Sequence, residues 1–280
     1  MGTRFTDLTG CGVPIQLAAM GGVGTTELAV AVIAAGGFGM VPMGVQPAEG
    51  ACGLNFLMPF VPSPEVIQES AGGVRVVEFF YGDPDAEVVA AAHAGGALAG
   101  WQVGSVAEAV AAAAIGCDYV VAQGVEAGGH VRGTQSLDEL LPRVLGAVRL
   151  PVVAAGGIAT PERVADLLRA GADAVRVGTR FIATPESGAH PDYIACLLDA
   201  AASDTVLTEW FGDGWENAPH RVLRSAVEAA GHSRWRSSMP PSAGIDRQAD
   251  DMAMYAGMGV GHVHAVQPAA EIVTDLVGLL

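Results

Sequence analysis

One short segment combines the residue types of a catalytic loop. Gln123–His130, with the sequence QGVEAGGH, places a single imidazole after an apolar run and among three glycines. An imidazole can accept or donate a proton near neutral pH, and glycine lets the backbone approach a flat ligand. We expect His130 to face a bound molecule as a base; the alternative is a structural histidine bonded to a backbone carbonyl. Glu126 is either a second acid/base group or a partner for loop amides and Arg132.

Two further glycine loops have the pattern of a phosphate site. AAGG (154–157) and GTR (178–180) each end a strand-like run. The backbone N–H groups of Gly156, Gly157, Gly178 and Thr179 could together surround a phosphate, because glycine leaves room for close approach. The alternative is that these glycines only form tight turns.

Weaker candidates lie at other strand ends. Met20 and its neighbours could pack on a ring system, and Asn55 can both donate to and accept from a heterocycle edge. Gln102 and Gln123 could do the same, and ordinary packing is the alternative for each. The paired histidines of GHVH (261–264) lack a third ligand, so we expect no metal site.

The elements that would position these residues follow a strand–helix rhythm. Eight apolar runs read as strands covered on both faces. They span 13–20, 38–44, 53–59, 74–80, 97–104, 118–124, 151–157 and 174–181. Helix candidates with capping residues lie between them, at 25–37, 63–73, 83–96, 105–116, 136–148 and 160–171. The rhythm predicts an α/β fold, a (β/α)8 TIM barrel. An open doubly wound sheet is the alternative, but its G-x-G-x-x-G motif is absent.

The rhythm breaks after the eighth strand. Residues 182–245 contain three of the four tryptophans and read as a small inserted lid subdomain. We therefore predict a barrel from residues 1–181 and 246–280. Two last helices, at 246–259 and 267–280, would complete its outer ring.

Composition restricts the partners. The net charge is −16, and all fourteen basic residues are arginine. Such a chain repels nucleic-acid phosphates, so a small-molecule substrate is the better expectation. The four cysteines are far apart and no apolar run of membrane-spanning length is unbroken, so we expect a cytoplasmic protein that does not enter a membrane. A homodimer is left open.

The chain resembles the nitronate monooxygenase family, also called 2-nitropropane dioxygenases. The resemblance rests on PIQLAAMGGVGTTELAVAVIAAGGFG, LNF, AQGVEAGGHVRG, PVVAAGGIA, ADAVRVGTRFIATPES and DTVLTEWF, and it runs over nearly the whole chain. The family consists of FMN-dependent βα barrels, and flavin-dependent enoyl-thioester reductases belong to the same superfamily. The resemblance thus implies FMN across the barrel mouth.

The resemblance also implies roles for individual residues. His130 matches the family's proposed catalytic base, which deprotonates a nitroalkane or orients a nitronate. The residues matching the cofactor site are Ala19, Met20, Gly21, Asn55, Gln102, Gln123, Gly128, Gly129, Ala155, Gly156, Gly157, Gly178 and Thr179. O2 would complete oxidation of the nitronate to a carbonyl compound and nitrite. Gln102 stands where some members have lysine, so stabilisation of a reduced, anionic flavin must come from elsewhere.

Other functions stay open at this point. One is an FMN-dependent reductase or isomerase of enoyl or acyl thioesters, which NAD(P)H would reduce. Another is a flavin-binding protein without turnover, and a third is a barrel that binds a different phosphorylated ligand. Reduction by a nitronate or by NAD(P)H separates the first two.

Overall fold

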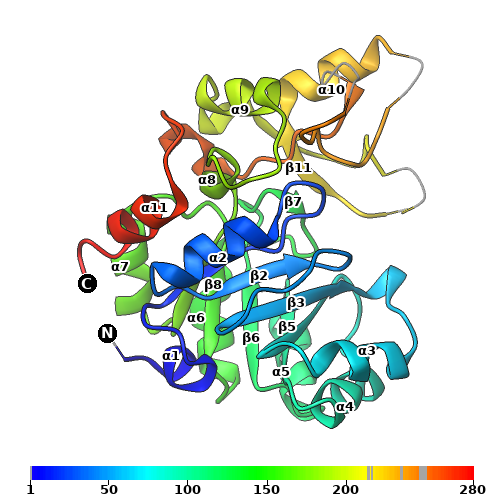
Figure 1. The fold of residues 1–280 in the computed structure, drawn as a ribbon, viewed down its shortest axis with the longest axis vertical. Helices are drawn as coiled ribbons and strands as arrows, with labels where there is room; N and C mark the ends of the chain where they lie inside the picture. Colours follow the sequence, from blue (N-terminus) through cyan, green and yellow to red (C-terminus); the bar gives the residue numbers. More distant parts are fainter. Residues whose placement is uncertain (1, 213–214, 216, 234–235, 246–250) are drawn as a thin grey trace.

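The computed structural model describes residues 2–280 except 213–214, 216, 234–235 and 246–250. Eight parallel strands form the centre of the molecule (Figure 1). They are β1 (Ile15–Leu17), β2 (Gly39–Pro42), β3 (Cys52–Leu57), β4 (Val76–Phe80), β5 (Leu98–Val103), β6 (Tyr119–Gln123), β8 (Val152–Ala155) and β9 (Ala174–Val177). Each lies within or beside one of the eight predicted runs.

The sheet is a nearly closed barrel. Its strand order is β1-β9-β8-β6-β5-β4-β3-β2. A parallel bridge between Gln16 and Phe38 connects the first strand to the last in this order. The predicted TIM barrel is therefore confirmed, and the open sheet is excluded.

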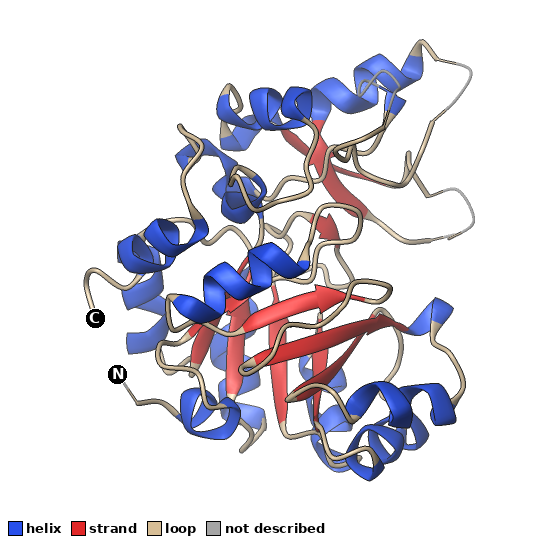
Figure 2. Cartoon of the chain, viewed as in Figure 1, coloured by secondary structure: helices blue, strands red, loops and turns tan. Residues whose placement is uncertain are grey.

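Helices surround the strands (Figure 2). The outer elements of the barrel are α2 (Thr26–Ala34), α3 (Pro64–Ala71), α4 (Ala86–Ala94), α5 (Val106–Ala114), α6 (Leu137–Ala147), α7 (Pro161–Arg169), α8 (Thr179–Ile182) and α11 (Ala269–Leu276). Thr25, Ser105, Ser136 and Thr160 each accept a backbone N–H at a helix start, as the sequence predicts. No helix lies between β2 and β3, where the described chain forms a loop.

The barrel interior is packed rather than hollow. At the amino ends of the strands, α1 (Arg4–Thr9) inserts Phe5, whose ring contacts those of Phe38 and Tyr119 at centroid distances of 5.8 and 5.4 Å. The Tyr119 ring takes the space that a side chain at Gly100 would need: a Cβ there would lie 2.3 Å from Cζ of Tyr119. Glycine on β5 is thus what allows an aromatic ring on the adjacent strand.

A second, antiparallel sheet lies beyond the carboxyl ends of the strands. It consists of β10 (Thr205–Thr208), β11 (His220–Leu223) and β7 (Gly129–His130), and α9 (Pro191–Leu198) and α10 (Arg224–Gly231) accompany it. The short strand β7 comes from the loop after β6, so the barrel contributes one strand to the inserted sheet. His130 is paired in register with His220.

The predicted helix at 246–259 is wrong in its described part. Residues 246–250 lie outside the described residues, and Met252 and Tyr255 instead make isolated bridges with Ser237 and Val222. A 3-10 helix, Met258–His262, follows. The run DMAMYAGMG has apolar residues at spacings that fit a helix, but Ala253, Met254 and Ala256 pack into a second core beside the inserted sheet. The other predicted helix is α11. No helix in the described part of the chain is long and apolar enough to cross a membrane.

The Gly100–Tyr119 contact gives the first prediction. Gly100→Ala should lower the free energy of unfolding by about 1–3 kcal/mol, because the new methyl group overlaps a fully buried ring. Urea denaturation measures the change. Gly146→Ala is the matched control, since a Cβ there meets nothing within 4 Å. Equal stability of both variants would contradict the packing described here.

Candidate active site

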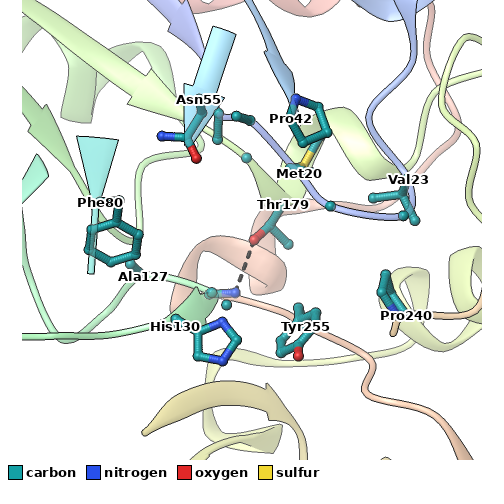
Figure 3. A pocket seen from close by; sticks show the side chains of 18 of the residues that line it. Met20, Val23, Pro42, Asn55, Phe80, Ala127, His130, Thr179, Pro240 and Tyr255 are labelled. Carbon is teal, nitrogen blue, oxygen red and sulfur yellow. Dashed lines mark hydrogen bonds between the residues drawn. The ribbon is translucent and has the colours of Figure 1, made fainter. Parts of the chain in front are cut away.

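One cavity lies at the carboxyl ends of the barrel strands, where catalytic groups of such barrels gather. Its volume is about 580 Å³, within the range of small-molecule sites. Every residue that the sequence predicts for the site lines it: Ala19, Met20, Gly21, Asn55, Gln102, Gln123, Gly128, Gly129, His130, Ala155, Gly156, Gly157, Gly178 and Thr179. Figure 3 shows Asn55 and Met20 on one side of the cavity and His130 and Tyr255 on the other.

The loops after β8 and β9 offer free backbone donors. Within the described chain, no protein group accepts a hydrogen bond from the N–H of Gly156, Gly157, Gly178 or Thr179. Gly156 and Gly157 have φ angles of 119° and 67°, which favour glycine. Successive free amides in such a conformation bind anions well. The four predicted phosphate donors are thus present and unused.

A third glycine segment supports these loops. A Cβ on Gly128 would lie 2.5 Å from the Gly257 nitrogen, and one on Gly259 would lie 3.1 Å from the Gly157 carbonyl oxygen. The Gly257 N–H donates to Oγ1 of Thr179 over 2.9 Å, as Figure 3 marks. The three loops therefore pack backbone against backbone. Gly257 and Gly259 line the cavity too, and the sequence prediction missed them by assigning this run to a helix.

A buried ion pair lies beneath the cavity. Arg176 on β9 and Glu78 on β4 form a salt bridge with side chains 6% and 0% exposed. Arg176 also donates to Oε1 of Gln102 over 2.5 Å, and Asn55 Nδ2 donates to Glu78 Oε1 over 3.1 Å. The sequence prediction missed Arg176 and Glu78 as site residues. A partial signal was available, because each is a charge between apolar neighbours inside a predicted strand run.

Gln123 and Glu126 shape the loop that carries His130. Gln123 Nε2 donates to the His130 carbonyl oxygen over 2.9 Å. Both carboxylate oxygens of Glu126 accept from the Leu137 N–H, over 3.2 and 3.0 Å. Of the two roles left open for Glu126, the structure thus shows the bond to a loop amide. Both side chains bond to backbone atoms and not to the imidazole of His130. The imidazole is therefore oriented by its contacts with neighbouring rings.

His130 is enclosed by aromatic rings. Its imidazole stacks on Trp215 at a centroid distance of 4.1 Å and meets Tyr81, His220 and Tyr255 at 5.7, 5.3 and 5.8 Å. Burial, with His220 as a smaller cause, lowers the pKa of His130 to about 3. The ring is therefore neutral at physiological pH. It can donate one N–H and accept at its other nitrogen, but it is a weak base.

The inserted segment supplies the outer wall of the cavity. Tyr193, Trp215, Met239 and Pro240 line it, together with Tyr255. The Tyr255 hydroxyl donates to the Ser238 carbonyl over 2.6 Å, and burial raises the pKa of Tyr255. This wall is mainly apolar and aromatic. The tryptophan-rich composition of residues 182–245 was its only signal in the sequence.

Comparison with known proteins identifies similar sequences. The family model described as "Nitronate monooxygenase" matches residues 58–278. The nitronate monooxygenase of Pseudomonas aeruginosa is 31% identical over 81% of this chain and 82% of its own. The (3aS,4S,5R,7aS)-5-hydroxy-7a-methyl-1-oxo-octahydro-1H-indene-4-carboxyl-CoA dehydrogenase of Rhodococcus jostii is 32% identical over 83% of this chain and 69% of its own.

Solved structures of similar proteins share the fold of this chain. FabK from Thermotoga maritima superimposes with a TM-score of 0.85 at 28% identity, over 99% of this chain and 96% of that one. Nitroalkane oxidase from Streptomyces ansochromogenes superimposes with a TM-score of 0.79 at 32% identity, over 99% and 97%. The likeness thus covers the barrel and the inserted segment together.

The lowered pKa of His130 has a consequence for stability. Its folded pKa of about 3 lies below the unfolded value near 6.5, so the unfolded chain takes up the proton first as the pH falls. The contribution of neutral His130 is complete above pH 6.5 and lost toward pH 3. Between pH 7.5 and 5.5, His130→Gln should therefore lose less stability than the wild type, by about 1 kcal/mol.

Urea denaturation at the two pH values measures this difference. Both values stay above the isoelectric point of about 4.6, where the chain would tend to precipitate. His232→Gln is the control, because His232 is exposed. The same pH dependence in wild type and His130→Gln would show that the imidazole is not held neutral by the fold.

Proposed function

Because the chain belongs to the nitronate monooxygenase family, we propose that it is an FMN-dependent enzyme that oxidises alkyl nitronates with O2 to a carbonyl compound and nitrite. The observation that carries this proposal is the position of His130. A neutral imidazole, stacked on Trp215, faces a cavity whose other end has four free backbone amides. One end suits the substrate and the other suits the phosphate of a planar cofactor.

The residues of the cavity fit FMN. The free amides of Gly156, Gly157, Gly178 and Thr179 would hold its phosphate without a lysine. The glycines of the loop after β6 and Met20 after β1 would hold its flat ring. Asn55 and Gln102 would bind its polar edge. The neighbouring cavity residues Ala19, Gly21 and Ala155 would contact the cofactor through backbone and small side chains.

The residues of the chain would contribute by orienting the substrate and excluding water. Bound FMN supplies the redox chemistry, accepting reducing equivalents from the substrate and passing them to O2. His130 would donate an N–H to a nitronate oxygen and so orient the anion. Its low pKa favours this role over removal of a proton from a neutral nitroalkane. Trp215 and Tyr255 exclude water from the same side.

The inserted segment is the lid of this site. In this proposal residues 1–181 and 246–280 contain the FMN-binding barrel and residues 182–245 form the lid, although residues 252–256 pack against the lid. The pairing of β7 with β11 supports the lid assignment, because it connects the His130 loop to the inserted sheet. We place the enzyme in the cytoplasm, with a small-molecule substrate and O2 as its partners.

A second candidate is an FMN-dependent reductase of enoyl or acyl thioesters that uses NAD(P)H. It is favoured by the Rhodococcus jostii relative, whose name gives a carboxyl-CoA thioester as the compound it acts on. The apolar outer wall, with Met239 and Pro240, would also accept an acyl group, together with Phe60 of the barrel. Rapid reduction of the bound flavin by NADPH, and none by a nitronate, would select this candidate.

The role of His130 gives a prediction for catalysis. His130→Leu should leave the Kd for FMN unchanged and lower the rate of anaerobic flavin reduction by an alkyl nitronate by about 10–100-fold, because leucine has no donor and a hydrogen bond to a charged group is lost. Stopped-flow absorbance measures the rate. His232→Leu, on the exposed surface, should match the wild type. Equal rates for His130→Leu and wild type would remove His130 from the reaction.

The phosphate site gives a separate prediction. In Gly178→Val the new Cβ would lie 3.2 Å from the Ala18 Cβ, so the valine must displace the Gly178 and Thr179 amides. The Kd for FMN should rise at least about tenfold, as measured by quenching of flavin fluorescence. Gly146→Val, on α6 and in open space, is the control. An unchanged affinity would show that the phosphate binds elsewhere.

A further inference from the structure

The buried cation beneath the cavity has no part in the steps described so far. Arg176 is the residue on β9 whose guanidinium reaches the barrel axis and lines the cavity. Nε and Nη2 both donate to Oε1 of Gln16, over 3.1 and 2.9 Å. Its remaining contacts are Glu78 and Gln102. The arginine is therefore fixed on several sides.

The chemistry of these partners decides how two amide groups are turned. Arginine has only donors, so the Gln102 atom 2.5 Å from its Nη1 must be the amide oxygen. An ionised carboxylate has only acceptors, so the Asn55 atom 3.1 Å from Glu78 Oε1 must be the amide nitrogen. The second carboxylate oxygen of Glu78 is occupied by Arg176 and by the Tyr119 hydroxyl, at 2.7 Å for the latter.

The opposite atom of each amide is left for the cavity. Gln102 keeps its NH2 group and Asn55 keeps its carbonyl oxygen, and within the described chain neither atom has a protein partner. Figure 3 shows the oxygen of Asn55 turned into the cavity and its nitrogen turned away. The two residues lie on β3 and β5, on either side of β4. The cavity thus offers one donor and one acceptor.

We propose that Arg176 is a positioning residue that sets this polarity. It turns the Gln102 NH2 toward the cavity and, through Glu78, turns the Asn55 oxygen the same way. One donor and one acceptor complement a ring imide, in which a C=O lies next to an N–H. This inference rests on the proposed function, because the pyrimidine edge of FMN is such an imide, and it adds that the recognition depends on an ion pair below the ring.

The burial of the pair supports a positioning role. A buried ion pair costs much of its attraction in desolvation, so it is a weak source of stability, and two apolar side chains would fill the space as well. What apolar side chains would not do is fix the orientation of the neighbouring amides. Without Arg176, Gln102 would be free to turn its oxygen to the cavity, and the donor would be lost for part of the time.

The test compares three flavins by fluorescence titration of the apoprotein: FMN, FMN methylated at ring N3, and 5-deaza-FMN. The wild type should bind FMN and 5-deaza-FMN alike, and the N3-methyl compound about 10–100-fold more weakly, because the Asn55 oxygen loses its donor. In the charge-neutral double variant Glu78→Gln/Arg176→Met, the discrimination should fall below about fivefold and the Kd for FMN should rise about tenfold.

Two further variants keep the test decisive. Gln102→Glu retains an acceptor for Arg176 but removes the NH2 donor, so FMN binding should weaken about tenfold or more while the N3-methyl discrimination persists. Arg4→Met/Asp173→Asn removes the partly exposed ion pair at the other end of the barrel and should keep the wild-type discrimination. This control separates the loss of an ion pair from the loss of amide orientation.

The outcomes are distinguishable. Binding of FMN without discrimination against the N3-methyl compound overturns the donor–acceptor edge and leaves the cofactor assignment intact. Full discrimination in a folded double variant, or unchanged FMN affinity in Gln102→Glu, overturns the role of Arg176 alone. Failure of the wild type to bind any of the three flavins overturns the proposed cofactor and the inference together.

Discussion

A charge buried inside a barrel must be matched by an opposite charge and by hydrogen bonds, and this constraint organises the site. Arg176 and Glu78 lie almost without solvent exposure on β9 and β4. Burying both charges costs desolvation free energy, which further hydrogen bonds offset. These bonds come from Gln16, Gln102, Asn55 and Tyr119. The polar layer in turn requires Gly100, which leaves room for the Tyr119 ring. The cavity rests on this layer.

The two halves of the cavity are built by different means. Backbone makes the half after β8 and β9, where positive φ angles and free amides leave a surface without side chains. Side chains make the other half, where Trp215 of the inserted segment and Tyr255 after it flank the imidazole. The short strand β7 joins them, since it pairs with β11 while its histidine faces the cavity. A movement of the inserted sheet would therefore carry His130 with it.

The sequence was most informative where the chain repeats a simple rule. Parallel strands covered on both faces are continuously apolar, so all eight were found, and strand ends marked by glycine placed residues such as Gly156 and Gly178 correctly at one cavity. The rule fails after β9. Met252 and Tyr255 were assigned to a helix because their spacing allows it, but bridges to distant residues hold them extended. The spacing of apolar residues within a short segment does not predict bridges to distant residues.

The burial of His130 also lay outside the reach of sequence. Its place after β6 predicted that it would face the cavity, but not that Trp215, some 85 residues later in the chain, would cover its ring. Burial, with His220 as a smaller cause, lowers the pKa of His130 to about 3, so the imidazole is neutral at the pH where the sequence alone predicted a base. The sequence thus predicted the position of His130, and contacts between distant segments determine its protonation state.

The most direct measurement of the central claim is the anaerobic visible spectrum of the FMN-loaded protein before and after addition of an alkyl nitronate. If the cavity binds FMN beneath a nitronate oriented by His130, the absorption of the oxidised flavin will bleach, and admission of O2 will restore it with release of nitrite. A spectrum that stays unchanged with the nitronate but bleaches with NADPH would contradict the monooxygenase function and establish the reductase in its place.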